Sequence, residues 1–400
     1  MKKPKLICLI HRIPYPPNKG DKIRSYNMLL GLKEHFDIFL GGFIDDPADV
    51  RYVSNVEELC VETKLLEINS RQRTVFSALG FLHGLPLSVV YYQSAEMQSW
   101  VNDTLRQHPE ASVYVFSSAM GQFVPEQAQP RTVVDFVDVD SDKWRQYSVA
   151  KKFPMSWIYA REARTLLKFE QVLARSTAAS TFVSTQEAQF FSKQVPDHAD
   201  KVHAVSNGVD LSYFSSTASF KKLHLAGNPV VTFVGAMDYW ANVDAVVWFA
   251  QQVMPLLTAQ LSQIQFYIVG GNPTADVQRL AGPNVVVTGR VEDVRPYMEC
   301  ADVIVAPLRI ARGIQNKVLE ALAFAKPVVA SSMAMEGINC SSVCVADSPI
   351  ATADAIQQLL ADSDRASALA NDARTFVEEN FAWSVFQDQM SQLQLAATKH

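Results

Sequence analysis

The sequence predicts an α/β protein with two successive domains, each built around a parallel β-sheet covered by helices. Short apolar runs rich in β-branched residues alternate with helix-length segments almost throughout the 400 residues. These runs do not alternate with polar residues, as expected for strands buried on both faces. A polar stretch at 212–228 divides the runs into two groups, and a chain of this length has room for two domains.

The first group predicts an N-terminal domain over residues 1–215. We expect its strands at 6–10, 38–43, 113–116, 132–137 and 180–184. Helices are expected between them, among others at 23–34 and 160–174. Because each strand is followed by a helix, the strands are predicted to run parallel.

The second group predicts a similar domain over residues 216–380. Its strands are expected at 230–235, 266–271, 285–289, 303–307 and 327–331, with an edge strand at 342–346. Helices are expected at 243–254, 291–300 and 315–325. Ligands of open α/β sheets bind beyond the carboxyl ends of the strands, so we expect a site in a cleft between the two domains.

Composition excludes several classes of protein. Apolar residues make up 48% of the chain and charged residues 19%, which is not the composition of a disordered protein. The formal net charge of -5 argues against a nucleic-acid partner. Five cysteines without a C-x-x-C pair argue against a disulfide scaffold and a structural zinc site, and favour a reducing compartment. The opening apolar run, 6–10, is too short for a signal peptide, and no run is long enough to span a membrane. We therefore expect a cytoplasmic protein.

The stretch 306–332 carries the most informative group of residues. A predicted strand ends near 307, and a loop with Gly313 leads into a helix that begins near Gln315. Free N–H groups at a helix start attract phosphate, and Arg309, Arg312 and Lys317 add positive charge there. The sequence therefore predicts a phosphate-binding loop.

Glu320 lies about one helical turn beyond Lys317, on the same side of the predicted helix. Its carboxylate has the geometry to accept hydrogen bonds from the two vicinal hydroxyls of a ribose. The alternative is a surface ion pair between Lys317 and Glu320 that contributes only a few tenths of a kcal/mol. Spacing alone leaves both interpretations open.

The same stretch resembles the donor-sugar signature of family 4 glycosyltransferases, which have the GT-B fold. Glu320, followed by ALAFAKPVVAS, matches the second glutamate of that signature. Arg312 stands where the family has its first glutamate, and Ala325 stands where it has a glycine. The stretches 205–214, 287–308 and 381–386 resemble the family's domain boundary, the approach to its donor pocket and its closing helix. The resemblance implies that residues 381–400 form a helix that crosses back to the first domain.

A closer resemblance is to the sugar transferases associated with exosortase (PEP-CTERM) systems, carried by 16–26, 135–144 and 312–321. It implies a retaining, metal-independent hexosyltransferase-like enzyme with no cofactor, which takes a nucleotide-diphosphate sugar such as a UDP-sugar as co-substrate. The acceptor implied is a lipid-linked or growing exopolysaccharide glycan at the inner face of the cytoplasmic membrane. The donor-binding residues implied are Gly20, Gly235, Arg290, Arg309, Gly313, Ile314 and Glu320. The catalytic residues implied are Asp138, Arg312 and Lys317.

The acceptor is expected on the N-terminal domain. The loop 14–25 carries Lys19, Asp21, Lys22 and Arg24, whose bases favour an anionic ligand, although a plain turn with solvated lysines would look the same. Asp138 and Asp140 spell D-x-D after a predicted strand. We favour an acceptor-side or catalytic carboxylate over a metal ligand here, with a capped turn of solvated acids as the alternative. His11, Ser117 and Ser118 also follow strands of this domain. Two interpretations of His11 are open: its side chain points into the predicted cleft, or it has only a structural role.

Two rival functions and one partner remain open. A nucleotide-sugar epimerase would share the fold and release nucleotide without an acceptor. A catalytically silent nucleotide- or sugar-binding protein would be consistent with Arg312 in place of an acid. The stretches 76–92, preceded by Arg71 and Arg73, and 144–168 mix basic, aromatic and apolar residues. That mixture predicts either a peripheral contact with a membrane or ordinary core helices.

Overall fold

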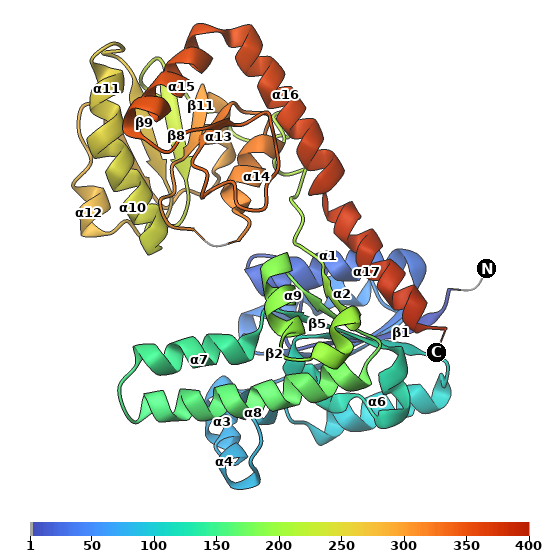
Figure 1. The fold of residues 1–400 in the computed structure, drawn as a ribbon. Coiled ribbons are helices and arrows are strands. Elements are labelled where there is room, and N and C mark those ends of the chain that lie inside the picture. Colours follow the sequence, from blue (N-terminus) through green and yellow to red (C-terminus); the bar gives the residue numbers. More distant parts are fainter. Residues whose placement is uncertain (1–2, 312, 400) are drawn as a thin grey trace. The chain divides into compact units, whose positions relative to one another are not determined.

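The computed structural model describes residues 3–311 and 313–399. The chain forms two compact units (Figure 1). The first contains the described residues up to Asn207 and those from Phe386 onwards, and the second is Gly208–Val385. Each unit contains one sheet in which all paired strands are parallel, so the predicted architecture of two parallel-sheet α/β domains is confirmed. The chain passes from the first unit to the second after Asn207, whereas the sequence predicts this boundary at residue 215.

The first unit is built on a seven-stranded sheet with the order β3-β2-β1-β4-β5-β6-β7. The strand order reverses at β1, because the chain adds β2 and β3 on one side and β4 to β7 on the other. Its strands are β1 (Lys5–Ile10), β2 (Asp37–Ile44), β3 (Glu62–Glu67), β4 (Ser112–Phe116), β5 (Thr132–Val137), β6 (Ala179–Phe182) and β7 (Val202–Ala204). The sequence analysis missed β3 and β7. β3 is a polar edge strand that is largely half-buried, and β7 has only three residues.

The helices of this unit connect and cover the strands. They are α1 (Gly20–His35), α2 (Val53–Glu57), α3 (Ser70–Ser77), α4 (Gly80–His83), α5 (Leu87–Tyr91), α6 (Ala95–Gln107), α7 (Asp140–Ala150), α8 (Met155–Ser176) and α9 (Thr185–Ser192). Short 3₁₀ helices lie at η1 (Pro47–Tyr52), η2 (Ser118–Phe123), η3 (Glu126–Arg131) and η4 (Pro196–Lys201). The middle strands β1 and β4 are almost fully buried because helices cover both faces of the sheet.

The second unit is built on a six-stranded sheet with the order β10-β9-β8-β11-β12-β13. Here the strand order reverses at β8. The strands are β8 (Val230–Val234), β9 (Gln265–Val269), β10 (Val285–Gly289), β11 (Val303–Ala306), β12 (Val328–Ala330) and β13 (Cys344–Val345). The helical segments are α10 (Trp240–Trp248), a π-helix η5 (Phe249–Val253), α11 (Met254–Thr258), α12 (Ala275–Gln278), α13 (Arg295–Cys300), α14 (Asn316–Ala323), α15 (Pro349–Ala361) and α16 (Ser363–Asn380).

The last helix, α17 (Trp383–Ala397), brings the chain back to the first unit. It packs on α1, where the Gln387 side-chain amide donates a hydrogen bond of 2.8 Å to the Asn27 carbonyl. A Cβ added to Gly31 would lie 2.5 Å from that of Gln387, so α1 needs a glycine at this contact. Within residues 3–311 and 313–399, no helix is both long enough and apolar enough to cross a membrane.

Candidate active site

The reversal of strand order creates one crevice in each unit. In an open parallel sheet, the loops that follow two strands on either side of the reversal diverge, and ligands bind between them. In the second unit these are the loops after β8 and β11. In the first unit they are the loops after β1 and β4. The predicted site residues Gly235, Arg309 and Gly313 follow β8 or β11, while His11 follows β1.

In the second unit, the loop after β8 approaches the loop after β9 very closely. Gly270 has φ +157, and a Cβ there would lie 1.7 Å from the carbonyl oxygen of Gly235. The Gly235 N–H donates to the Val269 carbonyl at 3.0 Å. Any side chain at position 270 would push the loops after β8 and β9 apart, so this close approach requires a glycine.

The predicted phosphate loop forms a turn in front of α14. Gly313 has φ +70, and a Cβ there would meet no atom within 4 Å, so the turn is open. The Gly313 N–H donates to the Glu336 carboxylate at 3.1 Å, and the side-chain amide of Gln315 donates to the Gly313 carbonyl at 2.9 Å. Ile314 packs against the next loop, where a Cβ on Gly337 would lie 3.0 Å from it. These contacts fix the turn that leads into the first N–H groups of α14.

Lys317 and Glu320 lie together on α14, against β8 and β11. They border a narrow space of about 10 Å³, which holds about one water molecule. Burial raises the pKa of Glu320 to about 7, against the opposing attraction of Lys317. Burial likewise lowers the pKa of Lys317. The Lys317 ammonium lies 5.8 Å from the centre of the Phe233 ring. Both side chains are therefore partly buried and not fully solvated.

The other predicted cations of this unit differ in their surroundings. Arg309 is half-exposed and pairs with Asp244 of α10, its Nε donating to the carboxylate at 2.9 Å. Hydrogen bonding to Asp244 raises the pKa of Arg309. Arg290 follows β10, is exposed, and lies beside Gly271, the residue after the close approach described above. Arg312 lies outside the described residues.

The first unit has a pocket of about 360 Å³ at the carboxyl ends of β1, β4 and β5. Several of its polar groups were among the predicted residues, and others were not. Its polar and aromatic lining includes His11, Asp21, Ser88, Tyr92, Ser117, Ser118, Asp138, Asp140, Lys143 and Trp144. The pocket thus brings together the D-x-D carboxylates, the histidine after β1 and the serines after β4.

Backbone strain marks the rim of this pocket. Val137 has φ +71, and the Asp138 N–H donates back to the Phe136 carbonyl at 3.0 Å, which makes a γ-turn with a left-handed centre. A β-branched residue rarely adopts such a backbone. Ser117 also has a positive φ, +75. Strain of this kind costs about 1–3 kcal/mol per residue and clusters at functional sites.

The γ-turn at Val137 presents Asp138, which is exposed, and is followed by Asp140, which is partly buried, and both carboxylates line the pocket. Burial raises the pKa of both carboxyls, and Lys143 partly opposes this effect. The Lys143 ammonium lies 3.9 Å from the Asp140 carboxylate. Among the described residues, no group of three or more histidine, cysteine or acidic side chains is arranged to hold a metal ion.

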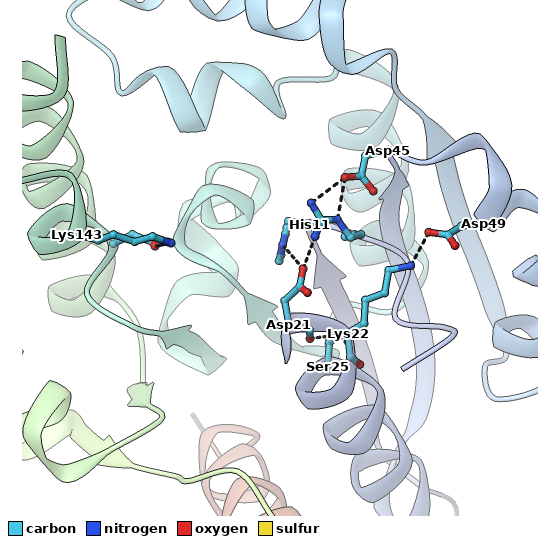
Figure 2. A network of polar contacts seen from close by, with 9 residues as sticks. His11, Asp21, Lys22, Ser25, Asp45, Asp49 and Lys143 are labelled. Carbon is cyan, nitrogen blue, oxygen red and sulfur yellow. Dashed lines mark hydrogen bonds and ion pairs between the residues drawn. The ribbon is translucent and has the colours of Figure 1, made fainter. Parts of the chain in front are cut away.

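His11 forms the opposite side of the pocket with Asp21. Its Nε2 lies 3.5 Å from the Asp21 carboxylate, which also accepts a 2.6 Å hydrogen bond from Arg12 (Figure 2). These partners hold the pKa of Asp21 well below its usual range, with the contact to His11 as the largest cause. The His11 ring stacks on Phe116 with 5.7 Å between centroids. Its Nδ1 is buried and has no hydrogen-bond partner among the described residues.

Two of the predicted basic residues have other roles. Arg24 was predicted to face the acceptor, but its side chain is 0% exposed and donates to both oxygens of Asp135, at 2.9 and 3.0 Å. Lys22 was grouped with it, but is 1% exposed and pairs with Asp49 (Figure 2). We correct both assignments, because helix α1 turns these positions toward the sheet. Lys19 and Gly20 are exposed at the start of α1.

Sequence reasoning missed Glu336, Tyr92, Lys143 and the strained Val137. Glu336 lies 23 residues beyond the Gly313 N–H to which it binds, and no local pattern links the two. Lys143 had a signal, because it is the only base in the stretch 135–144 that carries the D-x-D carboxylates. The left-handed backbone of Val137 gave no signal in the sequence, because valine is a residue that disfavours this conformation.

Part of the chain is similar in sequence to known proteins. Residues 228–362 match the family model described as glycosyl transferases group 1, and this segment contains all six strands of the second sheet. D-inositol 3-phosphate glycosyltransferase of Xylanimonas cellulosilytica is 29% identical over 257 residues, which is 58% of this chain. The match spans 59% of that relative, less than two thirds of its length.

Solved structures resemble the whole chain. HepE of Anabaena, solved in complex with UDP, aligns with a TM-score of 0.64 at 15% identity over 98% of this chain and 100% of that one. Sucrose-phosphate synthase of Thermosynechococcus elongatus aligns with a TM-score of 0.61 at 19% identity over 98% and 99%. A glycosyltransferase of Rickettsia africae gives 0.62 at 13% over 99% of each chain. Identities this low show the fold alone, and they confirm the predicted GT-B fold.

Proposed function

We propose that the protein is a glycosyltransferase that moves a sugar from a nucleotide-diphosphate sugar to a hydroxyl group of an acceptor. The observation that carries the proposal is the pair Lys317–Glu320, placed behind the open Gly313 turn at the strand reversal of the second unit. The segment that matches the group 1 family model includes this site. UDP is the first nucleotide to test, because HepE of Anabaena was solved with it.

The donor's diphosphate binds at the Gly313 turn, where the first N–H groups of α14 and the Lys317 ammonium supply positive charge. Arg312, beside the turn in sequence, adds a further cation. Negative charge develops on the diphosphate as it leaves the sugar, so positive groups fixed in advance lower the barrier. The ionised carboxylate of Glu320 accepts hydrogen bonds from the ribose hydroxyls. Arg309 contributes when phosphate draws it away from Asp244.

The acceptor hydroxyl binds in the pocket of the first unit. Asp138 and Asp140, whose carboxyl pKa values are raised by burial, bind a hydroxyl or take up its proton. His11 and Lys143 supply polar contacts from other walls of the pocket. By resemblance, the reaction proceeds with retention and without a metal, the chain belongs to the exosortase-associated subgroup, and the acceptor is a lipid-linked or growing exopolysaccharide glycan at the inner face of the membrane.

A two-stage experiment tests the proposal. Thermal-shift screening of nucleotide sugars identifies the donor, and release of free nucleotide is then measured with and without candidate acceptors. A transferase releases nucleotide at a high rate only with acceptor. Equal release without acceptor would indicate an epimerase, and tight binding without any turnover would indicate a silent binding protein. NMR of the product's anomeric proton then reads the stereochemistry.

A further inference from the structure

Helices α7 and α8 form a hairpin that extends from the sheet of the first unit (Figure 1). The end of this hairpin carries exposed apolar side chains. Phe153, in the loop between the two helices, is 82% exposed. Val149 at the end of α7 is 80% exposed, and Trp157 at the start of α8 is 53% exposed. Single exposed apolar residues are ordinary, but a cluster of large ones marks an interaction surface.

A second segment, far away in sequence, extends this surface. Helix α3 exposes Val75 and Phe76, and Leu79 is exposed just before α4. Phe81 of α4 stacks on Trp157 of the hairpin, with 5.8 Å between ring centroids and 9° between planes. The stack joins α4 to the start of α8, where Trp157 is one of the exposed apolar side chains.

Polar contacts hold this connection in place. Arg161 of α8 donates to the Leu85 carbonyl at 3.1 Å, and its guanidinium lies 4.6 Å from the centre of the Phe81 ring. The buried Glu162 carboxylate accepts the N–H of Leu87 at 2.7 Å and that of Ser88 at 2.9 Å. These contacts hold the segment 80–88 against α8.

The charge of both segments is one-sided. Residues 68–95 contain Arg71 and Arg73 but no acid, and residues 145–161 contain four bases and no acid. The whole chain, by contrast, has 41 acidic and 36 basic residues. Lys151 and Lys152, next to Phe153, are exposed. Exposed apolar side chains on two segments that contain bases but no acid match one partner above others, a bilayer with anionic headgroups.

We propose that this surface, named here the hairpin surface and made by Phe76, Val149, Lys151, Lys152, Phe153 and Trp157, binds an anionic lipid bilayer. The apolar side chains enter the boundary between headgroups and acyl chains, and the lysines attract the anionic headgroups. Three residues that line the pocket of the first unit, Ser88, Trp144 and Leu166, lie on α5, α7 and α8. The helices α7 and α8 also form the hairpin. Bilayer binding would therefore bring a lipid-linked acceptor to the pocket, a step that rests on the proposed function.

Vesicle co-sedimentation of the full chain tests the surface without any donor or acceptor. We expect binding to phosphatidylcholine vesicles that contain phosphatidylglycerol, weak binding to phosphatidylcholine alone, and loss of binding with rising salt. Replacing both lysines (K151Q/K152Q) should weaken partition into the vesicles about 30-fold, because each base contributes a factor of about five and the two factors multiply. The matched control K221Q/K222Q removes an adjacent pair of exposed lysines elsewhere and should bind like wild type.

A second matched pair tests the apolar part. Val149→Ser should weaken partition about fivefold, while Val61→Ser, also at an exposed valine of the first unit, should not. Equal binding to neutral and anionic vesicles, or wild-type binding by K151Q/K152Q, would overturn the proposal. Far-UV circular dichroism of the same preparations shows whether each variant is folded.

The two proposals fail separately in these measurements. Transfer to a soluble acceptor by a wild-type protein that ignores anionic vesicles would refute the hairpin surface and leave the proposed function standing. Vesicle binding with the expected variant pattern, but without turnover of any donor, would refute the proposed function and leave the surface standing.

Discussion

Replacing Glu320 by glutamine is the sharpest test of the donor site, because it should raise stability and weaken ligand binding at the same pH. Burial raises the pKa of Glu320 from 4.5 to about 7 in the folded protein. The folded state therefore holds the proton more tightly than the unfolded state. Stability contributed by the protonated form is fully present below pH 4.5 and is lost as the pH rises through about 7.

The size of the stability effect follows from this pKa difference of about 2.5, at about 1.36 kcal/mol per pKa unit. Ionised Glu320 thus lowers the free energy of unfolding by up to about 3 kcal/mol at pH 8. Glutamine imitates the protonated carboxyl at every pH. We expect Glu320→Gln to match wild type near pH 4.5 and to be more stable by up to that amount at pH 8. The pKa shift of Glu320 already includes the attraction between its ionised carboxylate and Lys317, so the loss of this attraction in the variant needs no separate correction.

The effect on binding has the opposite sign. If the ribose hydroxyls bind the ionised carboxylate, only about one tenth of the wild-type protein is competent at pH 6, against about nine tenths at pH 8. The affinity for UDP-glucose should therefore rise about tenfold between pH 6 and pH 8. Glu320→Gln should bind about 10- to 100-fold more weakly at pH 8, because hydrogen bonds to a charged acceptor are lost, and it should lack this pH dependence.

Urea denaturation at pH 5 and pH 8 measures the first effect, and calorimetry with UDP-glucose at pH 6, 7 and 8 measures the second. UDP-glucose is preferred to UDP, because a terminal phosphate titrates near pH 6 and would add its own pH dependence. Glu379→Gln, an exposed position on α16 of the same unit, is the matched control. A Glu320→Gln protein that is less stable than wild type at pH 8, or that keeps the tenfold pH dependence, would refute the reasoning.

Three further predictions address other parts of the molecule. Arg24→Met should lower the free energy of unfolding by about 3–5 kcal/mol in urea titrations, because it leaves the fully buried Asp135 unpaired; a loss below 1 kcal/mol would contradict the pair's importance. Ala325→Gly should raise the free energy of unfolding by about 0.5–1 kcal/mol, because Ala325 has the positive φ of +54 that glycine adopts more easily. An unchanged free energy of unfolding would argue against backbone strain at this position. Asp138→Asn should lower kcat by about 10²–10⁴-fold and leave the affinity for UDP-glucose, measured by calorimetry, unchanged. A weaker affinity for UDP-glucose with an unchanged kcat would show that Asp138 binds the donor and not the acceptor.

The sequence predicted those parts of the fold in which local pattern and burial agree. β1 and β4 are continuous apolar runs because helices cover both faces of the sheet. β3, with the sequence ETKLLE, is an edge strand that pairs on one side only, so it needs no apolar run and gave no signal. The turn at Gly313 was predictable because glycine and the following helix start are adjacent in sequence.

Contacts between distant residues were out of reach. Arg24 looked like a ligand-binding residue because it lies in a basic, glycine-containing loop. Its partner Asp135 is 111 residues away, and nothing local to either residue shows the pairing. The pocket of the first unit shows the same limit, since His11, Ser117 and Asp138 follow three different strands. Each residue was noticed in the sequence, but only the sheet order β1-β4-β5 brings them together.

The corrected role of Arg24 connects the buried core with the proposed acceptor pocket. Besides Arg24, the Asp135 carboxylate accepts hydrogen bonds from Tyr114 at 2.9 Å and Thr181 at 3.0 Å, which ties β5 to β4 and β6. The Asp135 carbonyl accepts the N–H of the strained Ser117 at 2.8 Å.

Two residues further on, the chain makes the left-handed turn at Val137 that presents Asp138. Such strain persists only where the surrounding structure fixes the backbone on both sides. The Arg24–Asp135 pair provides that fixation from beneath the pocket. Loss of Arg24 should therefore reduce transfer through Asp138 even under conditions in which the variant remains folded, whereas the gain of stability in Ala325→Gly should leave transfer unchanged.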